Sequence, residues 1–440
     1  PINMNQTNAL QNIEYGQDHS IFTVNTAIYD LEVIKSAAYV MLDKAYIVLD
    51  GDPATKVMVE IRKKESGQDI NQLVYDLRRQ KRDVISLSLG ESYFNIPRFP
   101  FEPLDFEKGY HYSDSQGIPE LRDKIADYYN KYYGTDVNGK DDILISAGSK
   151  PIIFMCMLAI LNPRDEVLIH EPAWLSYQEQ VKLCNAKVSF IPYNEKINFF
   201  EKYFTDKTRL MIINNPNNPS GRVYSKDELL EIYSTCRSRG VYLMVDEAYS
   251  DFVIDEDFVS ILNLVPNMDG VITINSLSKN MGMSGWRIGY MIATPKFISK
   301  ILKLNQHLVT CGPTILLQYV SKYFDDILAY TLPQVREVVE KRKRIAKYLD
   351  ENEIKFLPGS STFYFFIDVS TYDGDILNLS LHMLLEHDIA MVPGLAYGKS
   401  TEKFLRMSIG TETEERIYLA IQSLKISMMN SYDSETINKE

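Results

Sequence analysis

One lysine of this chain stands where covalent chemistry is possible. The stretch Val271–Tyr290 runs from an apolar, β-prone segment into Lys279 and a turn rich in serine and glycine, and then reaches Arg287. A lysine amine can form a Schiff base with an aldehyde, while hydroxyl and guanidinium groups can hold a phosphate dianion. With the hydroxyls of Ser276 and Ser278, this stretch suits a ligand that is both an aldehyde and a phosphate. A surface lysine after a buried strand is the alternative for this stretch alone.

Two other segments carry polar side chains to the ends of apolar strands. Val241–Tyr249 runs into Asp246, and a buried acid is costly unless it is paired, for example with a protonated ring nitrogen. Leu210–Gly221 ends in a loop with Asn-Pro twice, and these prolines fix the chain so that Asn218 can present its amide to one ligand atom. A shared site is favoured by the order of the side chains along the chain, Asn218, Asp246, Tyr249, Lys279 and Arg287.

A third segment has the local form of an anion site. The strand that begins at Ile143 enters a turn of small residues, and an apolar helix follows from Pro151. Unpaired backbone N–H groups and the helix dipole point at a ligand in such a turn. We therefore expect Gly148, Ser149 and Lys150 to form a phosphate loop, although glycine-serine turns are common.

These segments together resemble the class I and II aminotransferases, which have the fold-type I architecture and use pyridoxal 5'-phosphate (PLP). The lysine motif is similar to Ser-x-Ser-Lys followed by Arg-x-Gly, and the proline loop is similar to Asn-Pro-x-Asn-Pro-Thr-Gly, with Ser220 in place of threonine. The segment from Tyr112 to Arg122 is similar to Tyr-x-x-x-x-Gly-x-x-x-Leu-Arg, and Phe404–Gly410 to the C-terminal Arg-x-Ser-x-Gly strand. The resemblance extends from about Asp69 to the polar tail near Asn430.

The resemblance implies a role for each matching residue. Lys279, Asp246 and Tyr249 would be catalytic, with Asp246 on the pyridine nitrogen. Cofactor contacts would come from Gly148, Ser149, Lys150, Trp174 (stacked on the ring), Asn218, Tyr249, Ser276, Ser278 and Arg287, and from Tyr112, which would reach the phosphate of the partner subunit in a homodimer. The substrate would meet Gly90, Asn218 and Arg406, the last by a two-fold hydrogen bond to its α-carboxylate. No metal site is expected.

The expected function is therefore transamination between an amino acid and a 2-oxo acid through a Schiff base on Lys279. Two alternatives stay open. The same cofactor also supports decarboxylation, elimination or oxidation, on an amino acid or a peptide, and the chain could instead be a non-catalytic scaffold that binds PLP or a peptide. No residue stands out as a second substrate arginine, so a preference for dicarboxylic substrates is unsupported.

The expected fold is α/β, because strands alternate with helices through most of the chain. A large PLP-binding domain with a mostly parallel sheet is expected at 111–324, and a small α/β domain with the entry arm at 69–110 and 325–430, followed by a polar tail at 431–440. The small domain should contain a long charged helix around Leu332–Asn352, with Pro333 near its start, and strands at Phe363–Val369 and Ile389–Val392.

The first part of the chain, 1–68, looks like an accessory β-α-β-β unit. After a polar lead-in we expect a strand at Ile21–Val24, a helix at Asp30–Leu42, and strands at Ala45–Leu49 and Lys56–Ile61. A further helix is expected around Ile70–Gln80. Part of this segment resembles small proteins associated with peptides rich in His-Xaa-Ser repeats, which would imply a peptide partner in a maturation pathway. A plain packing or dimerisation appendage is the alternative.

The composition is that of a soluble globular protein, with 45% hydrophobic and 24% charged residues. The net charge of -12 disfavours nucleic acid and anionic membranes as partners. The four cysteines have no disulfide or metal spacing, no segment is apolar for long enough to cross a membrane, and the N-terminal residues lack a signal-peptide pattern. We therefore expect a cytoplasmic location.

Overall fold

A computed structural model describes most of the chain after residue 84 and four strands before it. The described residues are 10–15, 19–25, 45–52, 56–63, 84–253 and 258–429. The helices predicted at Asp30–Leu42 and Ile70–Gln80, and the polar tail at 431–440, lie outside this set.

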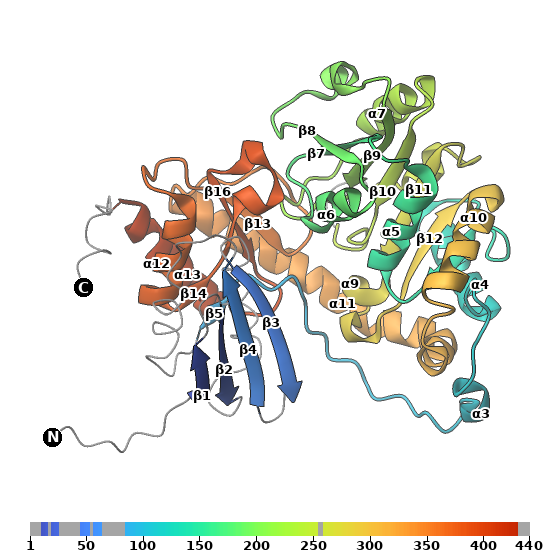
Figure 1. The fold of residues 1–440 in the computed structure, drawn as a ribbon, viewed down its shortest axis with the longest axis horizontal. Coiled ribbons are helices and arrows are strands. Elements are labelled where there is room, and N and C mark those ends of the chain that lie inside the picture. Colours follow the sequence, from blue (N-terminus) through green and yellow to red (C-terminus); the bar gives the residue numbers. More distant parts are fainter. Residues whose placement is uncertain are drawn as a thin grey trace.

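The largest sheet has seven strands, which confirms the prediction of a mostly parallel α/β sheet (Figure 1). Its strand order is β6-β12-β11-β10-β9-β7-β8, and β12 alone runs antiparallel to its neighbours. The strands are β6 (Ile143–Ser146), β7 (Glu166–His170), β8 (Lys187–Ile191), β9 (Thr208–Asn214), β10 (Tyr242–Asp246), β11 (Val271–Ser276) and β12 (Gly289–Ala293).

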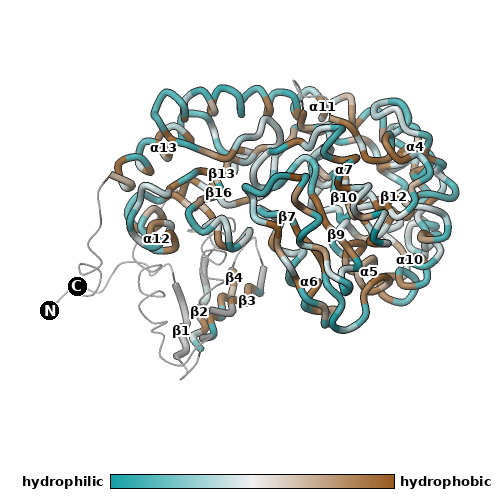
Figure 2. The backbone as a smooth tube through the Cα atoms, turned by 90° about the horizontal axis from the view of Figure 1, so that it is seen from above, coloured by the Kyte–Doolittle hydropathy of each residue, from teal (hydrophilic) through white to brown (hydrophobic). Residues whose placement is uncertain are grey.

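Helices cover both faces of this sheet, so most of its strands are apolar on both sides. On β10, for example, Leu243 and Val245 belong to one core and Met244 to the other. The first core includes residues of α4 (Pro119–Tyr133), α7 (Lys226–Ser238) and α8 (Ile261–Leu264); the second includes residues of α5 (Ser149–Ile160), α6 (Ser176–Leu183) and α10 (Pro295–Leu308). Figure 2 shows the apolar character of β9 and β10 in the interior.

A second layer is built from the C-terminal part of the chain (Figure 1). Its antiparallel sheet has the order β13-β16-β15, and β5 pairs with β14 in a separate parallel ladder. These strands are β13 (Tyr364–Asp368), β16 (Phe404–Ser408), β15 (Val392–Pro393), β5 (Ile85–Ser86) and β14 (Ile389–Ala390), packed with α12 (Ile376–His387) and α13 (Glu414–Met429). The predicted single strand Ile389–Val392 is wrong, because the chain changes pairing partner within that apolar run.

The long helical segment α11 (Thr314–Glu351) joins the two layers and has a kink at Tyr323, where the backbone leaves the helical conformation. Its first half contributes Leu317 to the core of the large sheet, and its second half contributes Val335 to the core of the C-terminal layer. The predicted helix start near Leu332 is therefore wrong. Pro333 lies inside the helix, where it removes a hydrogen bond, but the buried face continues across it and packing sustains the helix.

Short elements connect these parts. They are α3 (Phe106–Gly109), α9 (Leu277–Asn280), and the 3-10 turns η1 (Ile197–Tyr203), η2 (Ser284–Trp286), η3 (Gly394–Tyr397) and η4 (Lys399–Thr401). Within the described ranges, no helix is both long and apolar enough to cross a bilayer.

The described N-terminal residues form a separate four-stranded antiparallel sheet, with the order β1-β2-β4-β3. The strands are β1 (Leu10–Tyr15), β2 (His19–Asn25), β3 (Ala45–Asp52) and β4 (Lys56–Lys63). Val57, Val59 and Ile61 are buried on one face of β4. The predicted β-α-β-β unit missed β1, because a register shift between Gln11 and Glu14 breaks the two-residue alternation that identifies a strand.

Candidate active site

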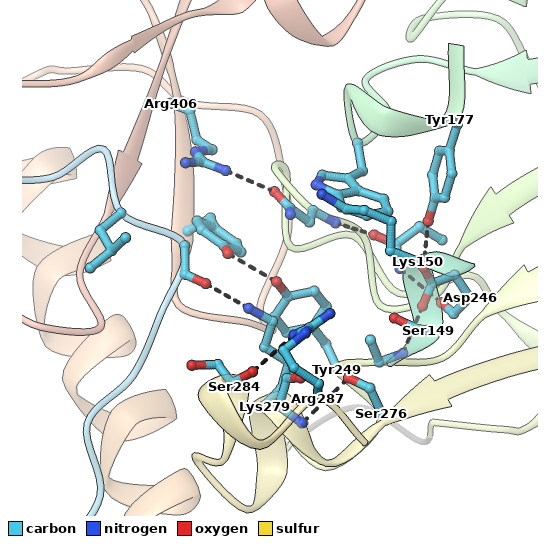
Figure 3. Close-up of a pocket in the computed structure, with 18 of the residues that line it drawn as sticks. Ser149, Lys150, Tyr177, Asp246, Tyr249, Ser276, Lys279, Ser284, Arg287 and Arg406 are labelled. Carbon is cyan, nitrogen blue, oxygen red and sulfur yellow. Dashed lines mark hydrogen bonds between the residues drawn. The ribbon is translucent and has the colours of Figure 1, made fainter. Parts of the chain in front are cut away.

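The candidate site lies at the carboxyl edge of the large sheet. Parallel strands end at this edge, and β12 begins there because it runs in the opposite direction. Side chains that precede β12 therefore meet side chains that follow the other strands, which is where open parallel sheets bind ligands. The pocket has a volume of about 300 Å³. Figure 3 shows side chains from both layers converging on it.

Lys279 lies on α9, directly after β11. The hydroxyl of Ser276 caps this short helix by accepting a hydrogen bond from the backbone N–H of Ser278. The Nζ of Lys279 donates to the backbone oxygen of Gly90 at 2.6 Å (Figure 3). Burial lowers the pKa of Lys279 to about 8, although the negative charges of Glu91 and Asp246 oppose this shift. The amine is consequently easy to deprotonate near neutral pH.

Asp246 ends β10 as a fully buried carboxylate. Its Oδ2 accepts a hydrogen bond from the hydroxyl of Tyr177 at 2.6 Å, and its Oδ1 accepts one from the backbone N–H of Ala248 at 3.1 Å. Burial raises the pKa of Asp246 above its ordinary value, while these hydrogen bonds and the charge of Lys279 oppose the rise. A buried acid that faces a pocket would be stabilised by a ligand carrying a proton on nitrogen.

A cradle for an anion lies at the start of α5. Gly148 precedes this helix without a side-chain cap, with a φ of 95°, so backbone N–H groups of the first turn are open to a ligand. A Cβ atom on Gly148 would lie 2.5 Å from Nη2 of Arg287. Burial, and after it the charge of Arg287, lowers the pKa of Lys150. Two cations at the beginning of one helix fit a phosphate group.

A second cluster lies on the side of the C-terminal layer. The guanidinium of Arg406 is buried on β16 and donates to the amide oxygen of Asn218 at 3.5 Å. The hydroxyls of Tyr249 and Tyr364 are 2.9 Å apart. The backbone N–H of Asn218 donates to Oδ1 of Asn214 at 2.6 Å, which fixes the proline loop against the end of β9.

The structure brings nearly all of the predicted site residues into one pocket. The predicted residues that line it are Gly90, Ser149, Lys150, Trp174, Asn218, Asp246, Tyr249, Ser276, Ser278, Lys279, Arg287 and Arg406. Gly148 lies against the guanidinium of Arg287. Tyr112 does not reach this pocket, and 84% of it is exposed to solvent.

Sequence reasoning missed several residues that line the pocket. They are Ser88, Leu89, Tyr177, Asn214, Ala248, Ser284 and Tyr364. The best available signal for Tyr177 was its position three residues after Trp174, at the start of a helix. The two rings meet edge to face at 5.3 Å, and Nζ of Lys150 lies 5.0 Å above the indole. For Tyr364 we find no sequence signal beyond its place at the start of an apolar strand.

The residues present fit PLP on observations of this structure. The pocket combines an amine with a depressed pKa, a buried acid that lacks a cation bonded to it among the described residues, and a cationic helix start suited to phosphate. These three features lie on Lys279, Asp246 and the turn from Gly148 to Lys150. They match the aldehyde, the ring nitrogen and the phosphate of one ligand.

Comparisons with known proteins agree with this class of fold and site. Residues 82–424 match the sequence profile described as "Aminotransferase class I and II", and residues 24–85 match that of the "His-Xaa-Ser system protein HxsD". The aspartate aminotransferase of Thermotoga maritima is 31% identical over 77% of this chain and 90% of its own length. The aromatic-amino-acid aminotransferase 2 of Thermococcus litoralis is 32% identical over 78% and 91%.

A solved structure shows the same similarity in three dimensions. The aromatic aminotransferase from Pyrococcus horikoshii OT3 superposes with a TM-score of 0.74 at 30% identity, covering 81% of this chain and 97% of that one. The fold and the pocket are thus those of a fold-type I PLP-dependent transferase. The chain belongs to the class I and II aminotransferase family and is a PLP-dependent enzyme of that family.

The acidity of Lys279 can be measured in cofactor-free protein. Because burial favours the neutral amine, labelling of Lys279 by an acylating reagent should increase with pH with a midpoint near 8, whereas an ordinary lysine side chain has its midpoint near ~10.4. Peptide mapping by mass spectrometry, with free Nα-acetyllysine as the reference, gives both curves. Coincident curves would contradict the depressed pKa.

The close approach of Gly148 and Arg287 predicts a defect in cofactor binding. Alanine at 148 would place Cβ against Arg287 at a positive φ, so Gly148→Ala should weaken PLP binding by about tenfold or more. Gly285→Ala is the matched control, because a Cβ there meets nothing within 4 Å, and it should change affinity by less than about twofold. Fluorescence titration of cofactor-free protein measures both. Equal affinities would contradict the cradle.

Proposed function

We propose that the amine of Lys279 carries the cofactor and moves the proton during transamination. When bound, PLP supplies an aldehyde that joins to amines and a ring that accepts the electron pair left at the substrate Cα. The neutral amine of Lys279 would take the proton from the substrate Cα and deliver it to the carbon that carried the aldehyde oxygen of the cofactor. The observation that carries this proposal is the buried Nζ with its pKa of about 8, 2.6 Å from the oxygen of Gly90.

The other pocket residues hold the reacting groups in place. Asp246, kept in position by Tyr177, holds a proton on the ring nitrogen, while Asn218 and Tyr249 donate to the phenolic oxygen of the cofactor. Trp174 packs on the ring, which fixes its plane. The phosphate is bound by Gly148, Ser149, Lys150, Ser276, Ser278 and Arg287. The pairing of Arg287 with the uncapped start of α5 supports this assignment.

The substrate is proposed to be an amino acid with a single carboxylate. Among the described residues, the cationic side chains that line the pocket are Lys150, Lys279, Arg287 and Arg406. The first three serve the cofactor, and Arg406 binds the α-carboxylate beside Gly90, so no cation of this set is left for a second carboxylate. Uncharged side chains would instead contact Trp174, Leu89 and Tyr364.

A homodimer is proposed because the segment before α4 displays aromatic residues to solvent. Tyr110 is 80% exposed and Tyr112 is 84% exposed, beside Phe106 at 42%. The rings of Phe106 and Tyr110 lie 6.5 Å apart, and contiguous exposed apolar groups are a feature of interaction surfaces. In the dimer, the hydroxyl of Tyr112 donates to the cofactor phosphate in the partner subunit.

We propose domains at 1–68, at 111–324 and at 69–110 with 325–430; the N-terminal sheet supports the first, and the core around β13 and β16 supports the last. A peptide partner for the N-terminal unit is supported by the profile match at 24–85. Binding of a synthetic His-Xaa-Ser repeat peptide to the full chain, compared with binding of a scrambled peptide, tests this proposal.

A cytoplasmic location agrees with the free cysteines, of which Cys156, Cys184 and Cys236 are buried.

The half-reaction tests transamination directly. An amino acid added without an oxo acid should convert bound PLP stoichiometrically into pyridoxamine phosphate, and Lys279→Ala should abolish this conversion. Phenylalanine and leucine should react faster than aspartate, because the cations that line the pocket among the described residues are all assigned to the cofactor or the α-carboxylate. Single-turnover absorbance and product analysis measure both results. Decarboxylation or elimination products would instead favour the alternative chemistry on the same cofactor, and PLP that is bound but never converted would favour a scaffold.

Mixing two impaired variants tests whether Tyr112 acts in the site of its own subunit or in that of the partner subunit. If Tyr112 acts in the partner subunit, Lys279→Ala and Tyr112→Phe chains combine into hybrids with one complete site, and random pairing restores about a quarter of the wild-type activity. If Tyr112 acts within its own chain, the hybrids contain no complete site and mixing restores nothing. Unmixed variants carried through the same unfolding and refolding provide the control.

A further inference from the structure

Tyr364 lies between two groups to which the proposed function gives separate tasks. It begins β13, and only 1% of its surface is exposed. Its hydroxyl is 2.9 Å from the hydroxyl of Tyr249, which lies beyond the end of β10 in the other layer. Its ring lies 4.7 Å from the guanidinium carbon of Arg406 on the neighbouring strand β16. One side chain thus contacts both the cofactor-facing tyrosine and the carboxylate-facing arginine.

The glycine opposite Tyr364 shows how closely this arrangement is packed. A Cβ atom on Gly90 would lie 2.6 Å from the hydroxyl oxygen of Tyr364 and 3.9 Å from Nη1 of Arg406. The backbone oxygen of the same glycine accepts the hydrogen bond from Lys279. Tyr364 therefore contacts Tyr249 and Arg406 and lies against the glycine that binds Lys279.

The number of protons on the two hydroxyls decides which tyrosine donates the hydrogen bond between them. Each tyrosine hydroxyl has one proton to donate and can also accept. The proposed function, on which this inference rests, uses the proton of Tyr249 for the phenolic oxygen of the cofactor. The hydrogen bond between the two hydroxyls must then be donated by Tyr364.

We propose that Tyr364 is a positioning residue with two separable parts. Its hydroxyl donates to Tyr249 and makes that phenol a better donor to the cofactor, because hydrogen bonds in a chain polarise one another. Its ring holds the Arg406 guanidinium in place by a cation–π contact. Substrate carboxylate recognition and cofactor electronics are thereby joined through one side chain.

The charges around the two hydroxyls come from several elements. Among the described residues, Asp246 on β10 and Arg406 on β16 act on the hydroxyl of Tyr249. The Nζ of Lys279 on α9 lies 5.7 Å from the ring of Tyr249, and Glu91 and Arg287 act in turn on Lys279. Burial raises the pKa of Tyr249 well above its ordinary value, Tyr364 adds to the rise, and Arg406 opposes it. The hydroxyl of Tyr249 therefore keeps its proton over the working pH range, and Tyr364→Phe leaves all of these charges in place.

The test separates the hydroxyl from the ring in the PLP-loaded enzyme. The visible absorbance of the bound cofactor is titrated with pH in the wild type, Tyr249→Phe, Tyr364→Phe, Tyr364→Leu and Tyr397→Phe, with circular dichroism to establish folding. Tyr397 is the matched control, because its ring lies 5.1 Å from the same guanidinium but does not line the pocket. KM for an amino acid is measured in parallel.

Tyr364→Phe should raise the midpoint of the absorbance titration by about 0.5 pKa unit, in the direction of Tyr249→Phe but by less. When Tyr249 is a weaker donor, the phenolic oxygen of the cofactor is less stabilised as an anion. The nitrogen through which Lys279 is joined to the cofactor then holds its proton more tightly. KM should stay close to that of the wild type in this variant. It should rise roughly three- to tenfold in Tyr364→Leu, which loses the ring. Tyr397→Phe should leave the midpoint in place.

Two results would overturn the inference. One is an unchanged midpoint in folded Tyr364→Phe when Tyr249→Phe shifts it, and the other is an equal shift in Tyr397→Phe. If Tyr249→Phe also leaves the midpoint unchanged, or if the wild type shows no band that depends on Lys279, the proposed function fails first and the inference fails with it.

Discussion

The buried carboxylate of Asp246 is the constraint around which the site is arranged. An acid without solvent at the end of an apolar strand destabilises the protein unless hydrogen bonds and a positive partner compensate for the lost hydration. Tyr177 and the backbone of Ala248 supply the hydrogen bonds. The positive partner is left to the ligand, and the amine of Lys279 lies close enough for the two charges to affect each other. The same burial that makes the acid costly makes the lysine nucleophilic.

The sheet topology brings these groups together from distant parts of the chain. Asp246 ends one of two parallel strands and Lys279 follows the other, whereas Arg287 precedes the antiparallel strand β12. Reversing that one strand moves its beginning to the edge where the other strands end. Arg287 can therefore approach the helix that follows β6, although it lies 138 positions after Ser149 in the sequence. The C-terminal layer adds Arg406 and Tyr364 from the opposite wall.

Much of the fold and of the site could be predicted because both depend on local patterns. Strands that are buried on both faces appear as apolar runs, and polar residues at their ends identify the edge of the sheet. Tyr177 and Tyr364 could not be assigned, since their partners lie 69 and 115 residues away in the sequence. The strand β1 was missed because of its bulge, and the start of α11 was misplaced because its stability through Pro333 comes from two cores that the local sequence does not reveal.

The shared helix α11 also affects how this protein unfolds on heating. Its apolar face is divided between the core of the large sheet and the core of the C-terminal layer. The part after the kink at Tyr323 reaches both cores, with Phe324 in the first and Val335 in the second. Melting of either layer would therefore remove packing partners from this part of the helix. The two layers are thereby coupled into one cooperative unit, and heating should dismantle the walls of the pocket together instead of one after the other.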